Sequence, residues 1–314
     1  MSESNTAPVD ANEAAQGSAN KWLALAAMMF AVSMMFIDQT IVSIAIPTIQ
    51  TELGLSEAGV QWVINGYLLS LSAFFALGGR LSDILGHKRM VLLGVTIFAV
   101  SSALCGATPD NSFAEAWLIV FRIIQGIGAA LLFPAALAIV VSTFPLKERG
   151  KALALFFGIT GGLTAIGPIM GGYLSEWTWR AIFWVNVPVA IIAIVLTLLA
   201  KVHTQHKREP LDYLGAVLIA AGMAFSVLGL QQASSWGWTD PRTIGSIVLG
   251  LILLAIFVKV ETRVKIPLIK VEIFKDRAFF VDNAVLFFAM MAFVPVFFFA
   301  SVYAQAVLGY NATN

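Results

Sequence analysis

Charged residues are scarce in this chain, and their scarcity indicates its class. Only 12% of the 314 residues are Asp, Glu, Lys or Arg, whereas 59% are hydrophobic. Soluble domains carry about 25% charged residues, so this chain has about half of the charge that a water-facing surface needs. The sequence therefore predicts an integral membrane protein. The net charge of +1 provides no broad basic surface, so no nucleic-acid partner is expected.

Cysteine and histidine are almost absent. The single cysteine, Cys105, excludes a disulfide framework and a cysteine metal site. His203 and His206 have a spacing that could bind a metal, but no carboxylate or cysteine completes the set, so no metal site is expected. The sequence also contains no nucleophile–base arrangement and no phosphate-binding loop. We therefore expect neither an enzyme nor a bound cofactor.

Long apolar runs follow a polar N-terminal segment. Residues 1–20 contain no apolar run, which predicts a disordered cytoplasmic tail. A membrane-spanning helix needs about 20 predominantly apolar residues. Runs of this length predict an all-α polytopic membrane protein with about nine transmembrane helices, at 22–46, 59–78, 90–107, 114–140, 151–174, 180–200, 213–231, 243–260 and 279–303.

The basic residues predict how these helices are oriented. If the N-terminus is cytoplasmic, 16 of the 19 Lys and Arg residues fall in cytoplasmic segments, only Arg180 and Arg242 fall outside, and Arg122 lies within a span. Cytoplasmic loops of membrane proteins carry such an excess of Lys and Arg. We therefore expect a multi-pass protein of the cell membrane, surrounded by the lipid bilayer, with its N-terminus in the cytoplasm.

Two polar connections divide the predicted spans into groups. One, residues 201–211, follows the sixth span, and the other, residues 261–282, follows the eighth. The sequence therefore predicts a six-helix bundle over residues 21–200, a linker with a two-helix insert over residues 201–265, and one further helix within residues 266–314.

Two charged residues are predicted inside the bilayer, where charge by default marks a function or a buried partner. Asp38 and Arg122 each lie about eight residues from the outer end of a span, which places both at a depth of about 12 Å. Equal depth and opposite sign predict an ion pair or a shared aqueous cavity. Gln125 lies on the same helix face as Arg122, and Gln39 adjoins Asp38, so both are candidates for a substrate cavity.

Asp38 is the candidate site of proton uptake and release, with Arg122 adjusting its affinity for the proton. Burial favours the neutral form of a carboxylic acid, whereas a neighbouring guanidinium favours the ionised form, so the two effects can balance near the working pH. The alternative is a permanent ion pair that only fastens the first helix to the fourth.

A polar run lies between the second and third spans. It reads Gly79-Arg80-Leu81-Ser82-Asp83-Ile84-Leu85-Gly86-His87-Lys88-Arg89. Gly79 and Gly86 are expected to provide the backbone freedom for a tight reversal. The run resembles the loop between the second and third helices of major facilitator superfamily transporters. This resemblance implies that Gly79, Asp83, Gly86, Lys88 and Arg89 form a gating loop; the alternative is an ordinary membrane hairpin with basic flanks.

Further motifs resemble the fourteen-helix drug/proton antiporters of that superfamily. The run from Ile37 to Pro47 resembles their first-helix signature, and the run from Arg122 to Ala130 resembles their fourth-helix motif, whose arginine is implicated in proton transfer. Asp212-Tyr213-Leu214-Gly215 resembles the start of the extra helix pair of this branch.

The fifth span carries Gly167-Pro168-Ile169-Met170-Gly171-Gly172, which resembles the antiporter motif. Proline can kink a helix, and glycines four residues apart let helices approach closely, so plain helix packing is the alternative explanation. The motif's upstream glycine is replaced by Leu163, which is the argument for a uniporter or symporter of the same fold.

The resemblance implies the major facilitator fold and a secondary active transporter. Such a protein would use the proton gradient, without a cofactor, to export small amphipathic molecules or drugs by antiport. Fourteen-helix members continue for about five helices beyond the ninth, so the chain is expected to be C-terminally truncated. A truncated, transport-incompetent fragment is therefore a further alternative.

Overall fold

The computed structural model describes residues 11–164, 166–200, 202 and 210–306, and within these ranges the secondary structure is helical. The bundle consists of α1 (Ala11–Leu53), α2 (Glu57–Leu85), α3 (His87–Gly106), α4 (Ala114–Thr143), α5 (Leu146–Thr164), α6 (Ile166–Trp177), α7 (Ala181–Trp184) and α8 (Asn186–Leu199). It is followed by α9 (Tyr213–Trp236), α10 (Pro241–Glu261), the 3₁₀ helix η1 (Val271–Lys275) and α11 (Arg277–Ala306).

The described residues contain eight helical stretches that are long and apolar enough to cross a membrane. These stretches correspond to the first eight predicted spans, with α5 and α6 together forming the fifth and α7 and α8 the sixth. The break between α7 and α8 has a local cause. Pro188 has no N–H to donate to the carbonyl four residues earlier, and α7 ends at that residue, Trp184.

The N-terminal part of α1 differs from the prediction. The helix begins at Ala11, so residues 11–20, expected to be part of a disordered tail, are helical. The rest of that predicted tail, residues 1–10, lies outside the described residues. Most of the predicted linker after the sixth span, including His203 and His206, lies outside them as well.

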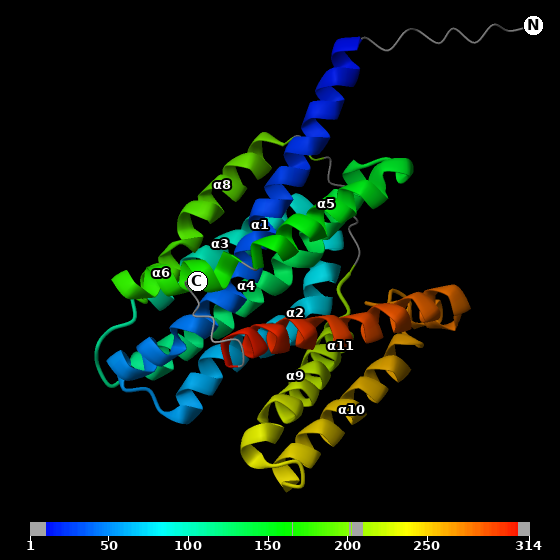
Figure 1. The fold of residues 1–314 in the computed structure, drawn as a ribbon. Coiled ribbons are helices and arrows are strands. Elements are labelled where there is room, and N and C mark those ends of the chain that lie inside the picture. The colour runs from blue at the N-terminus through cyan, green and yellow to red at the C-terminus, as the bar shows by residue number, and fades with distance from the viewer. Residues whose placement is uncertain (1–10, 165, 201, 203–209, 307–314) are drawn as a thin grey trace, which may run out of the picture.

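Helices α1 and α4 form the interior of the bundle (Figure 1). Helix α4 packs against α2 and α3, while α1 packs against α4, α5, α6 and α8. Glycines allow the closest approaches of α4 to its neighbours. A Cβ on Gly126 would clash with the Ser70 side chain and the Tyr67 carbonyl, and a Cβ on Gly128 would lie 2.8 Å from the Phe98 nitrogen. Small residues therefore let α4 contact both neighbouring helices at backbone distance.

Helices α2 and α4 are also in close contact at Gly78. Pro134 lies inside α4 and cannot donate to the Ala130 carbonyl, which is left without its usual helical donor. This carbonyl faces Gly78, where an added Cβ would clash with it. Gly79, predicted to lie in a turn, is instead inside α2, and an added Cβ there would meet Pro134 only at 3.7 Å.

The reversal between α2 and α3 requires a single residue, Gly86. Helix α2 continues to Leu85 rather than ending at residue 78, so Gly79 and Asp83 are helical and not loop residues. Gly86 has a φ of 96°, in the region that favours glycine, as the sequence predicts. Its N–H donates to the Ser82 carbonyl and satisfies the end of α2.

Helices α9 and α10 form a hairpin beside the bundle at the place of the predicted insert. They pack against each other, and α9 packs against α2. Both helices begin with an aspartate cap: Asp212 Oδ1 accepts the Gly215 N–H at 3.0 Å, and Asp240 Oδ1 accepts the Arg242 N–H at 2.7 Å.

Helix α11 occupies the position of the ninth predicted span and follows η1. Its closest described packing is against η1. Many of its described apolar side chains are exposed, among them Phe280, Val281, Val285, Leu286, Phe287 and Phe288. The described part of α11 therefore presents apolar surface that the bundle does not bury.

Candidate functional site

A layer of polar side chains crosses the bundle between two hydrophobic clusters. One cluster includes Met35, Tyr67, Phe98 and Ala129, and the other includes Ile41, Val63, Cys105, Leu118 and Phe183. The layer between them consists of Asp38 on α1, Ser102 on α3, Arg122 and Gln125 on α4, and Asn186 on α8, each at most 2% exposed. Burying polar groups costs free energy unless they are hydrogen-bonded, and here they bond one another.

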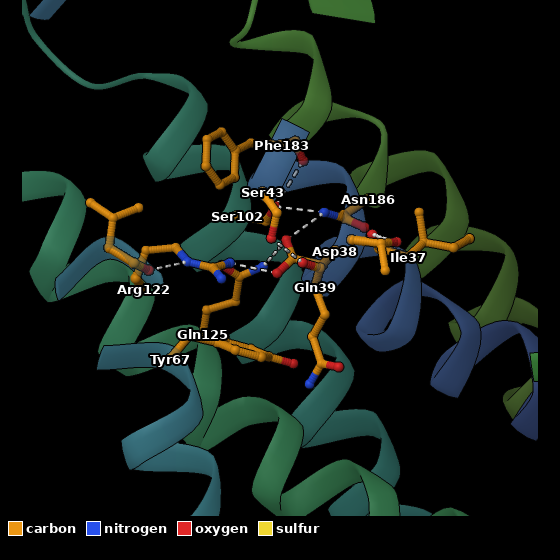
Figure 2. Close-up of polar contacts among 12 residues, drawn as sticks. Ile37, Asp38, Gln39, Ser43, Tyr67, Ser102, Arg122, Gln125, Phe183 and Asn186 are labelled. Carbon is orange, nitrogen blue, oxygen red and sulfur yellow. Dashed lines mark hydrogen bonds and ion pairs between the residues drawn. The ribbon is translucent and has the colours of Figure 1, made fainter. Parts of the chain in front are cut away.

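Helical spacing places these groups in the interior. Asp38 lies three residues after Met35 and three before Ile41, so all three share the buried face of α1. The same spacing places Gln125 beside Arg122 on α4, as the sequence predicts. The side chain of Gln39, the next residue, points away from the Asp38 carboxylate. Its amide extends toward the Tyr67 hydroxyl (Figure 2).

The Asp38 carboxylate accepts three hydrogen bonds (Figure 2). Arg122 Nη1 donates to Oδ2 at 2.5 Å. Gln125 Nε2 and Asn186 Nδ2 donate to Oδ1 at 2.8 Å and 3.3 Å. The structure therefore brings together Asp38, Arg122 and Gln125, and it matches the carboxyl group of Asp38 with one charged and two neutral donors.

Arg122 is held from two further directions. Its Nε donates to the Val63 carbonyl of α2 at 3.0 Å, and its Nη1 also donates to Gln125 Oε1 at 2.9 Å. The guanidinium carbon lies 4.5 Å from the centre of the Tyr67 ring, which permits a cation–π interaction. The arginine thus links α4 to both α1 and α2.

A second chain of hydrogen bonds leads from Asp38 to α3 and α7. Asn186 Nδ2 donates to Ser102 Oγ at 2.9 Å, and Ser102 Oγ donates to the Phe183 carbonyl at 2.8 Å. The sequence prediction omitted Asn186, Ser102 and Tyr67 from the site. In the sequence these three residues are recognisable only as polar side chains inside apolar spans. Their contacts in the structure distinguish them from the other buried polar side chains.

The predicted antiport residues lie on α6, directly against the turn of α1 that carries Asp38. A Cβ on Gly167 would clash with the Thr40 side chain, and a Cβ on Gly171 would lie 3.1 Å from the Ile41 carbonyl. Gly172 has open space around it, and Pro168 is half-buried. Gly167 and Gly171 therefore set the distance between α6 and α1.

The predicted gating residues lie at the other end of the helices, away from the polar layer. On α3, Lys88 is separated from Ser102 by 14 residues, or about 21 Å along the helix. Its Nζ donates to the carbonyls of Leu198 and Ala200 at 3.2 Å and 3.0 Å, so it caps the end of α8. Asp83 lies 4.0 Å from the His87 ring, Gly86 forms the turn, and Arg89 is exposed in the first turn of α3.

The polar layer surrounds one acid, Asp38, with fixed hydrogen-bond donors. Among the described residues, no group of three or more His, Cys, Asp or Glu side chains could hold a metal ion.

Comparison with known proteins gives consistent results. The sequence profile of the Major Facilitator Superfamily matches residues 28–314. The chain is 37% identical to the tetracenomycin C resistance and export protein of Streptomyces glaucescens, over 92% of this chain and 53% of that protein. It is 34% identical to the puromycin resistance protein of Streptomyces alboniger, over 97% of this chain and 60% of that protein. The chain spans about half the length of the curated relatives it matches.

Solved structures of low sequence identity share the fold. The POT family transporter PepTSo aligns with a TM-score of 0.56 at 16% identity, over 77% of this chain and 52% of that chain. The proton:xylose symporter XylE aligns with a TM-score of 0.51 at 15% identity, over 78% of this chain and 54% of that chain. Together with the profile match over most of its length, these findings establish that the chain belongs to the major facilitator superfamily, a family of membrane transport proteins rather than enzymes.

Proposed function

We propose that this protein takes part in proton-coupled export of small amphipathic molecules or drugs across the cell membrane. The main observation in support of this proposal is the buried network in which Asp38 accepts hydrogen bonds from Arg122, Gln125 and Asn186. The names of its relatives support the substrate class: one is a tetracenomycin C resistance and export protein, one a puromycin resistance protein and one a cephamycin export protein.

In this proposal Asp38 carries the proton and Arg122 sets its proton affinity. When Asp38 is ionised, Arg122 binds it and the polar layer is closed. When Asp38 is protonated, the guanidinium loses its counter-charge and is free to interact with another acceptor. The proton gradient is the energy source and no cofactor is needed. The N-terminus is cytoplasmic, which places Lys88 and Arg89 on the inner side.

The contact of α6 with α1 provides a route from this charge change to helix motion. Thr40 lies two residues after Asp38, and its Oγ1 donates to the Thr164 carbonyl at 3.1 Å. Gly167 packs on the same threonine. A displacement of the Asp38 turn is therefore passed directly to α5 and α6, with Pro168 as the flexible point.

The test is transport of puromycin by the purified chain in liposomes with an imposed pH gradient. We expect accumulation when the lumen is acidic, loss of accumulation with a protonophore, and no accumulation by Asp38→Asn. Asp110→Asn, which alters an acid of the outer surface, is the control and should behave like the wild type. Accumulation driven by an alkaline lumen, equilibration without a gradient, or no transport by the wild type would each contradict proton-coupled export.

A further inference from the structure

A second pair of acids lies at the base of the α9–α10 hairpin, on helices outside the six-helix bundle. Asp212 caps the start of α9, and Glu261, which is 3% exposed, is the last residue of α10. One oxygen of each acid has a backbone donor. Asp212 Oδ1 accepts the Gly215 N–H at 3.0 Å, and Glu261 Oε2 accepts the Ile269 N–H at 3.1 Å.

The other oxygen of each acid is buried without a hydrogen-bond donor. These two atoms are Asp212 Oδ2 and Glu261 Oε1. They lie against the same residue, because a Cβ on Gly215 would lie 2.6 Å from Asp212 Oδ2 and would also clash with Glu261 Oε1. The two acceptor atoms thus face each other across the open side of a glycine.

No base among the described residues forms an ion pair with either acid. Among the residues that the structure describes, the titratable side chains nearest along the chain are exposed; they are Tyr213, Lys259, Arg263, Lys265 and Lys270. Helix α2, which packs against α9, carries Arg80, which has an interaction of its own. Two ionised carboxylates in this position would repel each other with no cation between them. One proton removes the repulsion and supplies the missing donor to both oxygens.

We propose that Asp212 and Glu261 share one proton and form a proton-binding site separate from Asp38. The site joins three parts of the chain: the start of α9, the end of α10 and, through Ile269, the segment that leads to η1 and α11. Loss of the proton places two negative charges side by side, so this junction opens as the pH rises. Gly215 is required because any side chain at its position would occupy the space of the two oxygens.

Infrared spectroscopy of the purified chain tests the shared proton directly. Glu261→Gln keeps the shape of the side chain and provides a donor at every pH. At neutral pH, where a glutamate in water is ionised, the wild type should show a protonated-carboxyl band that is absent from Glu261→Gln and from Asp212→Asn. Glu272→Gln, which changes an exposed acid of η1, should retain the band. If Glu261→Gln differs from the wild type only by the loss of an ionised-carboxylate band, the proposal is wrong.

Amide hydrogen exchange of residues 262–270 provides a second readout that does not depend on transport. At each pH the wild type is compared with Glu261→Gln, so that the intrinsic pH dependence of exchange cancels. Protection of the wild type should fall relative to the variant as the pH rises. Equal protection at every pH would overturn the proposal. So would a response of the wild type to a chelator or to added Ca²⁺ or Mg²⁺, because a cation would then occupy the place of the proton.

Discussion

Neutralising Asp38 should destabilise the bundle strongly, because every donor around it is arranged for a charged acceptor. In Asp38→Asn, one carboxylate oxygen becomes an NH₂ group. If that group replaces Oδ2, it faces Arg122; if it replaces Oδ1, it faces Gln125 and Asn186. The first orientation opposes one donor and the second opposes two, and both leave Arg122, which is 1% exposed, without its counter-charge. Removing one member of a buried ion pair typically costs about 3–5 kcal/mol.

A double-mutant cycle separates the ion pair from its surroundings. Arg122→Gln removes the guanidinium, and the double variant Asp38→Asn/Arg122→Gln has neither charge. The double variant should lose about 2–3 kcal/mol less stability than the sum of the two single variants, in the upper part of the range of about 0.5–3 kcal/mol seen for residues in direct contact. The assay is reversible unfolding in mixed micelles with increasing sodium dodecyl sulfate, followed by circular dichroism.

The surface pair of Asp110 and Arg180 is the matched control for this cycle. Arg180 Nη2 lies 2.6 Å from Asp110 Oδ1, but the Asp110 side chain is 78% exposed. Asp110→Asn should therefore cost less than about 1 kcal/mol. If the two single losses at Asp38 and Arg122 simply add in the double variant, the pair is not coupled and the reasoning from the buried network is refuted.

Two pairs of glycines give further predictions, each with a built-in control and each measured as a shift in thermal unfolding of the purified protein. Gly78→Ala should cost about 1–3 kcal/mol because its Cβ would clash with the Ala130 carbonyl, whereas Gly79→Ala should be tolerated; similar losses for both would contradict the close contact of α2 and α4. Gly167→Ala should destabilise by a comparable amount because its Cβ would clash with Thr40, whereas Gly172→Ala, with open space around it, should be neutral or stabilise by up to about 1 kcal/mol. An equal response at these two positions would show that α6 does not pack on α1 through Gly167.

The sequence predicts the helices of the bundle because the bilayer imposes a minimum apolar length on each span. It also predicts the meeting of Asp38 with Arg122, since depth in the membrane and sign of charge can both be read from residue positions. Helix ends are predicted less well. Helix α2 continues to Leu85 because a helix that leaves the apolar layer keeps its backbone hydrogen bonds, although the hydropathy signal stops.

Most other contacts between distant segments could not be predicted from the sequence. Gly78, and not Gly79, is the tightly packed glycine of α2 because the Ala130 carbonyl, left free by Pro134, lies opposite it. Asn186 belongs to the polar layer because α8 is packed against α1 and α3. In both cases the deciding partner lies more than fifty residues away along the chain, so no local pattern indicates it.

The measurement that most directly tests the central claim is proton release on substrate binding. Puromycin is added to the purified chain in weakly buffered solution, and the protons released are followed with a pH indicator. The account predicts release by the wild type and by Asp110→Asn, and none by Asp38→Asn. Equal release by Asp38→Asn and the wild type would contradict the assignment of Asp38 as the proton carrier.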